Sequence, residues 1–436
     1  MKKILVTGLC TLHWGRLEYG NVGNYYIVEP LFRLIHKHFS DYEILTTFQM
    51  TEEFSRKEKV QVLPMEIYYN WDLEKDVENA FYDVEKARQY RNGGDITLSK
   101  YDEIVLECDL LINVSGDMWG DNAEHVGQQR FLVDCLKMKA AQLLGIKTIL
   151  YAVTPGPFDK VDDRNLALEV FKQFDLVVIR EKLSKHNLEK WGFPTKKVVW
   201  APCPSFLFEA NLAYQSKWTE YIENAHKNKR KVVGITFGGF NMPVGPYDMW
   251  PRDPEQYKVF LELAKYIIQN LNLDIVIFSH TNGFDLPPNF KLKNGRDYII
   301  LKEFYELLIE KDENYRKHVA LVDEPLLPCD IKALIGKLDM LITGRVHASV
   351  AATSQCIPTV YIEYDRRVIY SDKMYGFSSL LNMDKYVCVP GDLEGLIQTV
   401  TECYNNLEQI KKKLEKTIPQ IKQCADLIYE DIKKYV

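Results

Sequence analysis

Several signatures that would assign a function at once are missing from this sequence. The nine cysteines include no Cys-x-x-Cys pair, which excludes zinc-ribbon and thioredoxin-like proteins. Neither a Gly-x-Gly-x-x-Gly fingerprint nor a Walker pattern occurs, so the standard nucleotide-binding motifs are absent. No apolar run reaches the roughly 20 residues that a bilayer-spanning helix needs. The chain also lacks internal repeats and low-complexity segments.

The charge balance excludes one class of partner, and the cysteines favour one compartment. The formal net charge is -6, whereas general nucleic-acid-binding proteins are usually basic, so we expect no nucleic acid partner. Scattered cysteines, odd in number, fit free thiols in a reducing cytoplasm. The apolar stretch after Met1 is too short for a signal peptide and is interrupted by Gly8 and His13. We therefore expect a cytoplasmic protein that is held at a membrane at most peripherally.

The length of 436 residues predicts two or three domains of the usual ~150 residues each. A first α/β domain is expected over residues 1–206, with a charged, tyrosine-rich insertion at 51–103. The polar segment 207–231 ends in a basic run and is interpreted as a linker. The apolar strand that follows opens a second α/β domain over 232–391, and helical spacing of apolar residues predicts long helices over 392–436.

The segment Asp339–Asp365 predicts a βαβ unit. Met340–Thr343 is an apolar run of strand length, and Ala348–Cys356 has the composition of a small-residue helix. Pro358 ends that helix, because proline disfavours helical geometry at the residue before it. Thr359–Tyr364 is rich in β-branched and aromatic residues, so we expect a second strand that runs parallel to the first.

Arg345 and His347 lie where the first of these strands becomes the helix, directly after Gly344. A helix N-terminus attracts anions, and the arginine fork suits a carboxylate or a phosphate. If the helix starts after His347, both side chains point to one side of an extended backbone. This pattern predicts a site for a small, multiply charged anion. In the alternative, Arg345 caps a neighbouring loop and His347 is a hydrogen-bonded core residue; the local pattern leaves both interpretations open.

Polar residues also follow other predicted strands, and in open α/β sheets such positions mark ligand crevices. His280 follows the strand 275–278, and Arg180 follows the strand 176–179. Arg180 has a structural alternative, which is to lock its loop to Glu181 or to an adjacent Asp. The first predicted strand is followed by a glycine-rich loop and a helix, an arrangement that also fits a simple tight turn.

Four features of the second half together resemble the signature of the polysaccharide pyruvyl transferase family. They are Gly344-Arg345-x-His347, the small-residue helix, Ile357-Pro358-x-Val360 and Tyr364-Asp365-Arg366-Arg367. Shorter segments resemble further family motifs, namely Asn21-Val22-Gly23-Asn24, Gly116-Asp117 and Arg180-Glu181-x-x-Ser184. The sequence departs from the family pattern at Asn24 and Cys203, where an acid is usual, and at Cys356, where a glycine is usual.

The resemblance implies a GT-B-like α/β fold, with two Rossmann-like domains facing a cleft. It also implies a transferase that moves pyruvate from phosphoenolpyruvate to a sugar as a ketal, in extracellular or cell-wall polysaccharide biosynthesis. The saccharide acceptor could be lipid-linked, free or polymeric. The donor carries a carboxylate and a phosphate, so we expect cationic clamps and helix termini to bind it, with no cofactor and no metal.

The same resemblance implies roles for individual residues. Arg345 is the expected donor anion clamp, and His347 is the expected general acid or partner of the leaving phosphate. Further donor-binding residues are expected to be Gly344, His280, Tyr364, Asp365 and Arg366. Residues expected to face them from the other half, on the acceptor side, are Gly20, Asn21, Gly23, Asn24, Gly116, Asp117 and Arg180.

Two other functions remain open from the sequence. A nucleotide-sugar-dependent glycosyltransferase on the same fold needs a similar basic pocket, together with groups that bind a base and a ribose. A non-catalytic sugar-binding or scaffold protein is the second alternative, because Asn24, Cys203 and Cys356 depart from the family pattern. Retention of Arg345 and His347 argues against it.

Overall fold

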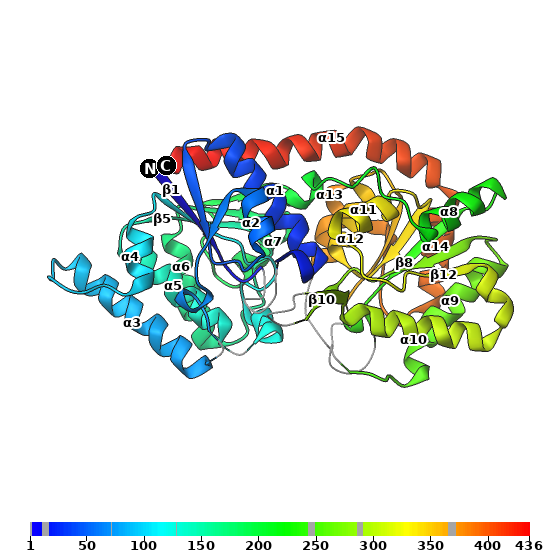
Figure 1. Cartoon of the computed structure of the whole chain (residues 1–436), viewed down its shortest axis with the longest axis horizontal. Coiled ribbons are helices and arrows are strands. Elements are labelled where there is room, and N and C mark those ends of the chain that lie inside the picture. The colour runs from blue at the N-terminus through cyan, green and yellow to red at the C-terminus, as the bar shows by residue number, and fades with distance from the viewer. Residues whose placement is uncertain are drawn as a thin grey trace. The chain divides into compact units, whose positions relative to one another are not determined.

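The computed structural model describes residues 2–10, 17–70, 72–127, 129–242, 249–285, 291–364 and 372–436 (Figure 1). Contacts between residues divide the chain into two compact units. Unit 1 comprises Met1–Glu18, Ile27–Pro204 and Gln423–Val436, and unit 2 comprises Tyr19–Tyr26 and Ser205–Lys422. Each unit is built around a parallel sheet of its own.

Unit 1 has a seven-stranded sheet in the order β3-β2-β1-β4-β5-β6-β7, and all neighbouring strands are parallel. The strands are β1 (Lys2–Thr7), β2 (Tyr42–Thr46), β3 (Val60–Val62), β4 (Leu110–Asn113), β5 (Lys147–Val153), β6 (Leu176–Ile179) and β7 (Val198–Trp200). Every residue of β4 and of β6 is buried, as expected for strands of a parallel sheet that is covered on both faces.

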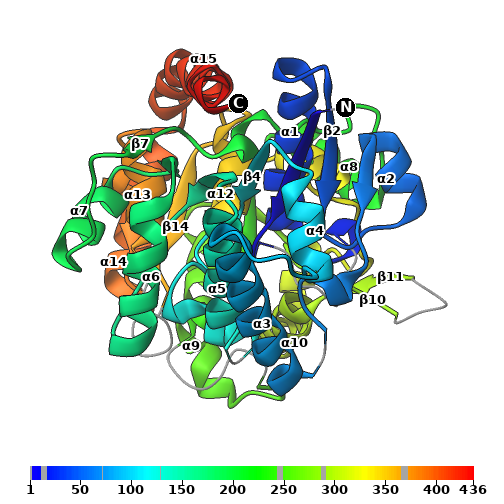
Figure 2. The same cartoon turned by 90° about the vertical axis from the view of Figure 1, so that its left-hand side faces the viewer.

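Helices connect the strands of unit 1. They are α1 (Val22–His38), α2 (Glu52–Glu58), α3 (Leu73–Arg91), α4 (Lys100–Leu106), α5 (Arg130–Leu143), α6 (Val161–Gln173) and α7 (Leu183–Lys190). Figure 2 shows α3 lying beside α5, and the two helices are in contact. Trp119 is fully buried near α5 and meets the rings of Phe131 and Phe158 edge-on. This aromatic cluster belongs to the core of unit 1.

The segment 51–103, which was predicted to hold helices and an insertion, is packed into unit 1. It contributes β3, which pairs with β2 at the edge of the sheet, and α3, which packs on α5. The buried residues Ala80, Val84 and Ala87 line one face of α3, and most of the charged residues of the helix lie on its other faces. The high charge of the segment therefore reflects an amphipathic covering helix, which sequence composition does not distinguish from an added loop.

Unit 2 has a six-stranded sheet in the order β12-β9-β8-β13-β14-β15, and all neighbouring strands are again parallel. The strands are β8 (Val232–Thr236), β9 (Asp274–Ile277), β12 (Val319–Leu321), β13 (Met340–Thr343), β14 (Thr359–Ile362) and β15 (Val387–Cys388). A separate antiparallel hairpin joins β10 (Asn282–Phe284) to β11 (Leu292–Asn294). The predicted βαβ unit is confirmed as β13, α12 (Val346–Thr353) and β14.

The other helices of unit 2 are α8 (Lys217–Lys227), α9 (Lys258–Gln269), α10 (Arg296–Lys311), α11 (Pro328–Ile335), α13 (Lys373–Leu380) and α14 (Leu393–Asn405). Helix α8 lies within the segment 207–231 that was predicted to be a linker. It buries Trp218 and Ile222, and the Trp218 Nε1 donates a hydrogen bond to the Leu321 carbonyl at 3.0 Å. The polar segment is therefore packed into unit 2 through its apolar face.

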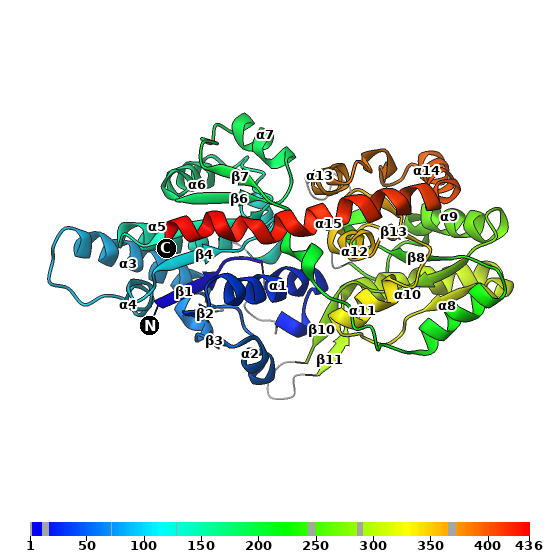
Figure 3. The same cartoon turned by 90° about the horizontal axis from the view of Figure 1, so that it is seen from above.

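The long helix α15 (Leu407–Ile432) is seen lengthwise in Figure 3. Its last turns belong to unit 1, where Asp426 is hydrogen-bonded to Lys37 Nζ at 2.6 Å and to His38 Nε2 at 2.9 Å. The ring of His38 also stacks on Tyr429. Within the described ranges, no helix combines the length and the apolar character needed to cross a membrane.

Candidate functional site

The candidate site of unit 2 lies at the carboxyl edge of its sheet. Gly238 follows β8, His280 follows β9, and Arg345 follows β13. These three strands are neighbours and run parallel, so their carboxyl ends meet at one edge. Helix α12 starts at Val346, two residues before the start at Ala348 that the sequence suggested. Arg345 is thus the extended N-cap residue, and His347 lies in the first turn of the helix.

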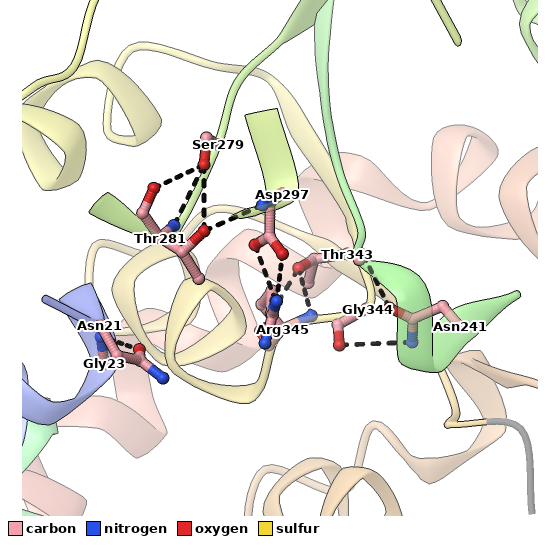
Figure 4. Close-up of polar contacts among 10 residues, drawn as sticks. Asn21, Gly23, Asn241, Ser279, Thr281, Asp297, Thr343, Gly344 and Arg345 are labelled. Atoms are coloured by element: carbon pink, nitrogen blue, oxygen red, sulfur yellow. Dashed lines mark hydrogen bonds and ion pairs between the residues drawn. The ribbon is translucent and has the colours of Figure 1, made fainter. Parts of the chain in front are cut away.

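The side chain of Arg345 is held by Asp297 (Figure 4). The Nε of Arg345 donates to Oδ2 of Asp297 at 2.8 Å, and Nη2 donates to Oδ1 of the same carboxylate. Arg345 is buried and Asp297 is fully buried. Burial raises the pKa of the Asp297 carboxyl, and the charge of Arg345 opposes that rise. Asp297 was not among the residues singled out from the sequence.

Two glycines near this pair leave room for side chains that a Cβ would strike. A Cβ on Gly238 would lie 2.6 Å from Asp297 Oδ1 and 2.7 Å from Arg345 Nη2. A Cβ on Gly344 would overlap the side-chain amide of Asn241. That amide accepts a hydrogen bond from the Gly238 N–H at 3.0 Å and donates one to the Glu363 carbonyl at 3.0 Å. Gly344 therefore makes room for the amide that joins the ends of β8 and β14, and it need not contact a ligand itself.

His280 is buried beside Arg345 and is electrically neutral. Burial lowers the pKa of His280 to about 3, and the nearby charge of Arg345 lowers it further. Its Nε2 has no hydrogen-bond partner among the residues that the structure describes. The ring meets Tyr26 of α1 edge-on, with the ring centroids 5.3 Å apart. A buried imidazole nitrogen of this kind can donate to or accept from a bound molecule.

The first turn of α1 lies against His347. A Cβ on Gly23 would come within 2.4 Å of His347 Nδ1. Asn21 pairs with Thr281 in an isolated β-bridge, and the Asn282 N–H donates to the Gly20 carbonyl at 3.1 Å. Residues 19–26, which include Gly20, Asn21, Gly23 and Asn24, therefore belong to unit 2 and not to the first domain in which the sequence placed them.

Gly116, Asp117 and Arg180 gather in unit 1. The Nε of the buried Arg180 donates to Thr154 Oγ1 at 2.7 Å, and its Nη2 lies 3.7 Å from Asp117 Oδ1. The contact with Asp117 is of the kind that the structural alternative for Arg180 expects. The carboxylate of Glu181 instead accepts hydrogen bonds from the N–H and Oγ of Ser184, and its burial raises its pKa to about 7.

The remaining sequence candidates have different outcomes. Tyr364 is buried; its ring contacts Phe240 at 5.8 Å and lies under the Lys373 ammonium at 4.3 Å. Asp365 and Arg366 lie outside the described residues. In the part of the chain that the structure describes, no group of three or more His, Cys, Asp or Glu side chains is arranged to hold a metal ion.

Several solved structures share the overall fold of this chain at low sequence identity. HepE from Anabaena, in complex with UDP, has a TM-score of 0.59 at 12% identity, covering 100% of this chain and 99% of its own. MnaA from S. aureus, solved with UDP, has a TM-score of 0.57 at 13% identity, covering 100% and 97%. A glycosyltransferase from Rickettsia africae has a TM-score of 0.56 at 11% identity, covering 100% and 97%. These similarities show that the chain has the GT-B fold.

The sequence comparisons are more specific than the fold. The model of the family "Polysaccharide pyruvyl transferase" matches residues 21–366, which include Asn21, Arg345 and His347. The amylovoran biosynthesis protein AmsJ from Erwinia amylovora is 20% identical over 349 residues, covering 78% of this chain and 76% of AmsJ. The chain belongs to the polysaccharide pyruvyl transferase family and is a transferase.

Proposed function

We propose that this protein transfers pyruvate from phosphoenolpyruvate to a saccharide as a cyclic ketal, in the biosynthesis of an extracellular or cell-wall polysaccharide. The observation that carries the proposal is the grouping of Arg345, His280 and the α1 turn that touches His347 within unit 2. A guanidinium and two helix N-termini suit a donor that bears both a carboxylate and a phosphate. Membership of the family supports the same chemistry.

In the proposed reaction, His347 protonates the methylene carbon of phosphoenolpyruvate. A sugar hydroxyl then forms a bond to the adjacent carbon and returns its proton to His347, and the bond from that carbon to the phosphate oxygen breaks. A second hydroxyl of the same sugar closes the ketal, and its proton leaves with the phosphate. Arg345 stabilises the negative charge of the donor and of the departing phosphate, a role that needs neither a metal nor a cofactor.

The other candidate residues take roles that follow from their surroundings. Gly20, Asn21, Gly23 and Asn24 are proposed to serve the donor, since their contacts are with the elements of unit 2. Tyr364, Asp365 and Arg366 keep the donor-side role that the family resemblance implies. Gly116, Asp117 and Arg180 are proposed to serve the acceptor. We also propose that the reaction takes place in the cytoplasm, consistent with the nine cysteines being free.

The test compares Arg345→Lys and His347→Ala with the wild type. Arg345→Lys keeps a charge next to Asp297 but loses the fork, so donor affinity should fall by about tenfold to a hundredfold. His347→Ala should lower turnover by ~10²–10⁴ while donor affinity changes much less. The measurements are calorimetric binding of phosphoenolpyruvate and phosphate release with donor and glycan.

Matched control variants are available in the same unit. Arg316→Ala removes an exposed arginine that is paired with Glu313, and His226→Ala removes an exposed histidine that is paired with Asp339. Both controls should bind and react as the wild type does. If Arg345→Lys binds phosphoenolpyruvate with wild-type affinity, Arg345 is not the clamp. Absence of phosphate release with any glycan would favour the non-catalytic alternative.

The glycosyltransferase alternative has a specific observation behind it, because two solved structures with this fold contain UDP. Thermal melting separates the two functions. Phosphoenolpyruvate should raise the melting temperature of the wild type, and UDP or a panel of nucleotide sugars should not. If only the nucleotide sugars stabilise the protein, the donor assignment is wrong and the glycosyltransferase function replaces it.

A further inference from the structure

A chain of buried polar side chains lies at the end of strand β4 in unit 1. Asn113 is the last residue of β4, whose other three residues are leucine and isoleucine, and it is fully buried. Its Nδ2 donates a hydrogen bond to Asp134 Oδ1 of α5 at 2.8 Å, and its Oδ1 accepts one from Ser115 Oγ at 2.5 Å. Ser115 Oγ in turn accepts the Leu9 N–H at 3.1 Å. The chain of hydrogen bonds thus runs from a core helix to the loops that follow β1 and β4.

The two ends of this chain fix the direction of every hydrogen bond in it. An ionised carboxylate can only accept hydrogen bonds, so Asp134 holds the amino end of the Asn113 amide. The carbonyl end of that amide therefore accepts the hydrogen bond that the Ser115 hydroxyl donates. At the other end, a backbone N–H can only donate, so it meets the Ser115 oxygen. Burial raises the pKa of Asp134 to about 6, and hydrogen bonds from Tyr68 and Asn113 oppose that rise, so the carboxyl is ionised at higher pH.

Stability alone is a weak reason for this arrangement. Asp134, Asn113 and Ser115 are all fully buried. Among the residues that the structure describes, Asp134 Oδ2 has no hydrogen-bond partner, and a buried acceptor without a partner destabilises the fold. Apolar side chains of similar shape in the same places would avoid that cost. A chain of polar groups that is costly to bury points to a role in holding the loops at its far end.

The loop after β4 is a tight turn that carries two of the candidate acceptor residues. The Ser115 carbonyl accepts the Met118 N–H at 2.9 Å, which closes the turn. Gly116 has a φ of +59°, in the left-handed region that favours glycine. Asp117 Oδ1 lies 3.7 Å from Arg180 Nη2. The side chain of Ser115, at the start of this turn, is the point at which the buried chain of hydrogen bonds reaches it.

We propose that Asp134 is a positioning residue for the saccharide acceptor, and that it acts through Asn113 and Ser115 on the turn that carries Gly116 and Asp117. The inference rests on the proposed function, which assigns those two residues to the acceptor. Because the turn is held in place before a sugar binds, less conformational entropy is lost on binding. The residues proposed to bind the donor are not part of this chain of hydrogen bonds, so donor affinity should not depend on it.

Asp134→Asn keeps the shape of the side chain and removes the charge that fixes the Asn113 amide. The assay is phosphate release at saturating phosphoenolpyruvate, with p-nitrophenyl glycosides of the common hexoses as acceptors. The KM for the best acceptor should rise by about tenfold. The kcat and the calorimetric affinity for phosphoenolpyruvate should change by less than about twofold. A merely structural role would lower the amount of active enzyme and leave KM unchanged, so an unchanged acceptor KM overturns the inference.

Ser115→Ala tests whether the effect passes along the chain. It removes the link to the turn while Asp134 still holds the Asn113 amide, so it should raise the acceptor KM by a similar factor. Adding Asp134→Asn to Ser115→Ala should then raise KM by less than about twofold more. Full, independent effects of the two substitutions would show that Asp134 acts by another route, against the inference. If Asp134→Asn does not fold, a wild-type acceptor KM in Ser115→Ala overturns the inference.

Two matched control variants are available in unit 1. Tyr68 donates a hydrogen bond to the same Asp134 Oδ1 but has no link to the turn through Asn113, and Asp102 is a fully buried carboxylate in the first turn of α4. Tyr68→Phe and Asp102→Asn should shift the melting temperature and leave the acceptor KM within about twofold of the wild type. If either control raises KM as much as Asp134→Asn does, the effect reflects a general loosening of unit 1, against the inference.

The proposed function and the positioning role fail in different ways. If the wild type turns over a glycoside and Asp134→Asn has the same acceptor KM, only the positioning role is lost. If the wild type releases phosphate with no glycan, the proposed function is lost, and amide hydrogen exchange decides whether Asp134 holds the turn. The Leu9 and Met118 amides should then exchange about tenfold faster in Asp134→Asn than in the wild type, and at the wild-type rate in Asp102→Asn. Unchanged exchange in Asp134→Asn would overturn the positioning role as well.

Discussion

Replacing Gly23 by alanine should lower turnover far more than it lowers stability. Gly23 lies in the first turn of α1, where an added Cβ would come within 2.4 Å of His347 Nδ1, 2.9 Å of its Cγ and 3.0 Å of its Cβ. Ordinary carbon contacts are about 3.5–4.0 Å, so the ring has to move by about 1 Å. A misplacement of that size at a catalytic group can cost about a hundredfold in rate.

The stability change should be small because two effects oppose each other. Alanine is favoured over glycine in a helix by up to about 1 kcal/mol. Overpacking typically costs about 1–3 kcal/mol. The net loss of unfolding free energy should therefore be between about zero and 2 kcal/mol, which a urea titration can measure. Phosphate release from phosphoenolpyruvate with a glycan acceptor measures the rate.

Two comparisons test whether displacement of His347 causes the loss of turnover in Gly23→Ala. In the His347→Ala background the imidazole that the new methyl would strike is absent, so Gly23→Ala should lower the residual rate by less than about threefold. Gly336→Ala is a matched control, since its Cβ would lie 2.5 Å from the Gln355 Oε1, at the end of a flexible side chain. Gly336→Ala should leave turnover unchanged. Wild-type turnover in Gly23→Ala would refute the placement of His347 at the reacting centre.

Two further predictions concern pH. Burial raises the pKa of Asp426, but hydrogen bonds from His38 and Lys37 outweigh the effect of burial and hold the pKa below 3.8. The ionised Asp426 therefore stabilises the fold above pH 3.8, and this stabilisation is lost as the pH falls through the pKa of the folded state. Asp426→Asn should thus lower the melting temperature at pH 7 and have little effect near pH 2; an equal effect at both would contradict this. Burial raises the pKa of Glu181 from 4.5 to about 7, so ionisation costs stability progressively between those values. Glu181→Gln should gain stability relative to the wild type between pH 4.5 and 8 in urea titrations, and a flat difference would count against the raised pKa.

Local patterns predicted the elements around the site well. Met340–Thr343 is confirmed as a strand with the bounds that its apolar run gave, and a second parallel strand and a small-residue helix follow as expected. These features depend on side chains a few residues apart, whose period is visible in one stretch of sequence. The family resemblance rested on the same stretch and is confirmed by the match over residues 21–366.

Composition was a weaker guide to which segments belong to a packed unit. Residues 51–103 and 207–231 looked like an insertion and a linker because they are rich in charge. In the structure, both supply amphipathic helices whose apolar stripes are buried, in α3 and α8. Average charge over a segment does not record whether the few apolar residues share one face, so it cannot separate a surface helix from an added loop.

The sequence by itself determined the strand, the turn and the helix that carry Arg345 and His347, and with them the family. Only the tertiary structure decided what surrounds those side chains. Asp297 reaches Arg345 because α10 starts near the end of β9, and Gly23 reaches His347 because residues 19–26 pack with unit 2 and not with the strand that precedes them. Such contacts depend on strand order and on which backbones come close enough to exclude a Cβ, and neither leaves a periodic trace in the sequence.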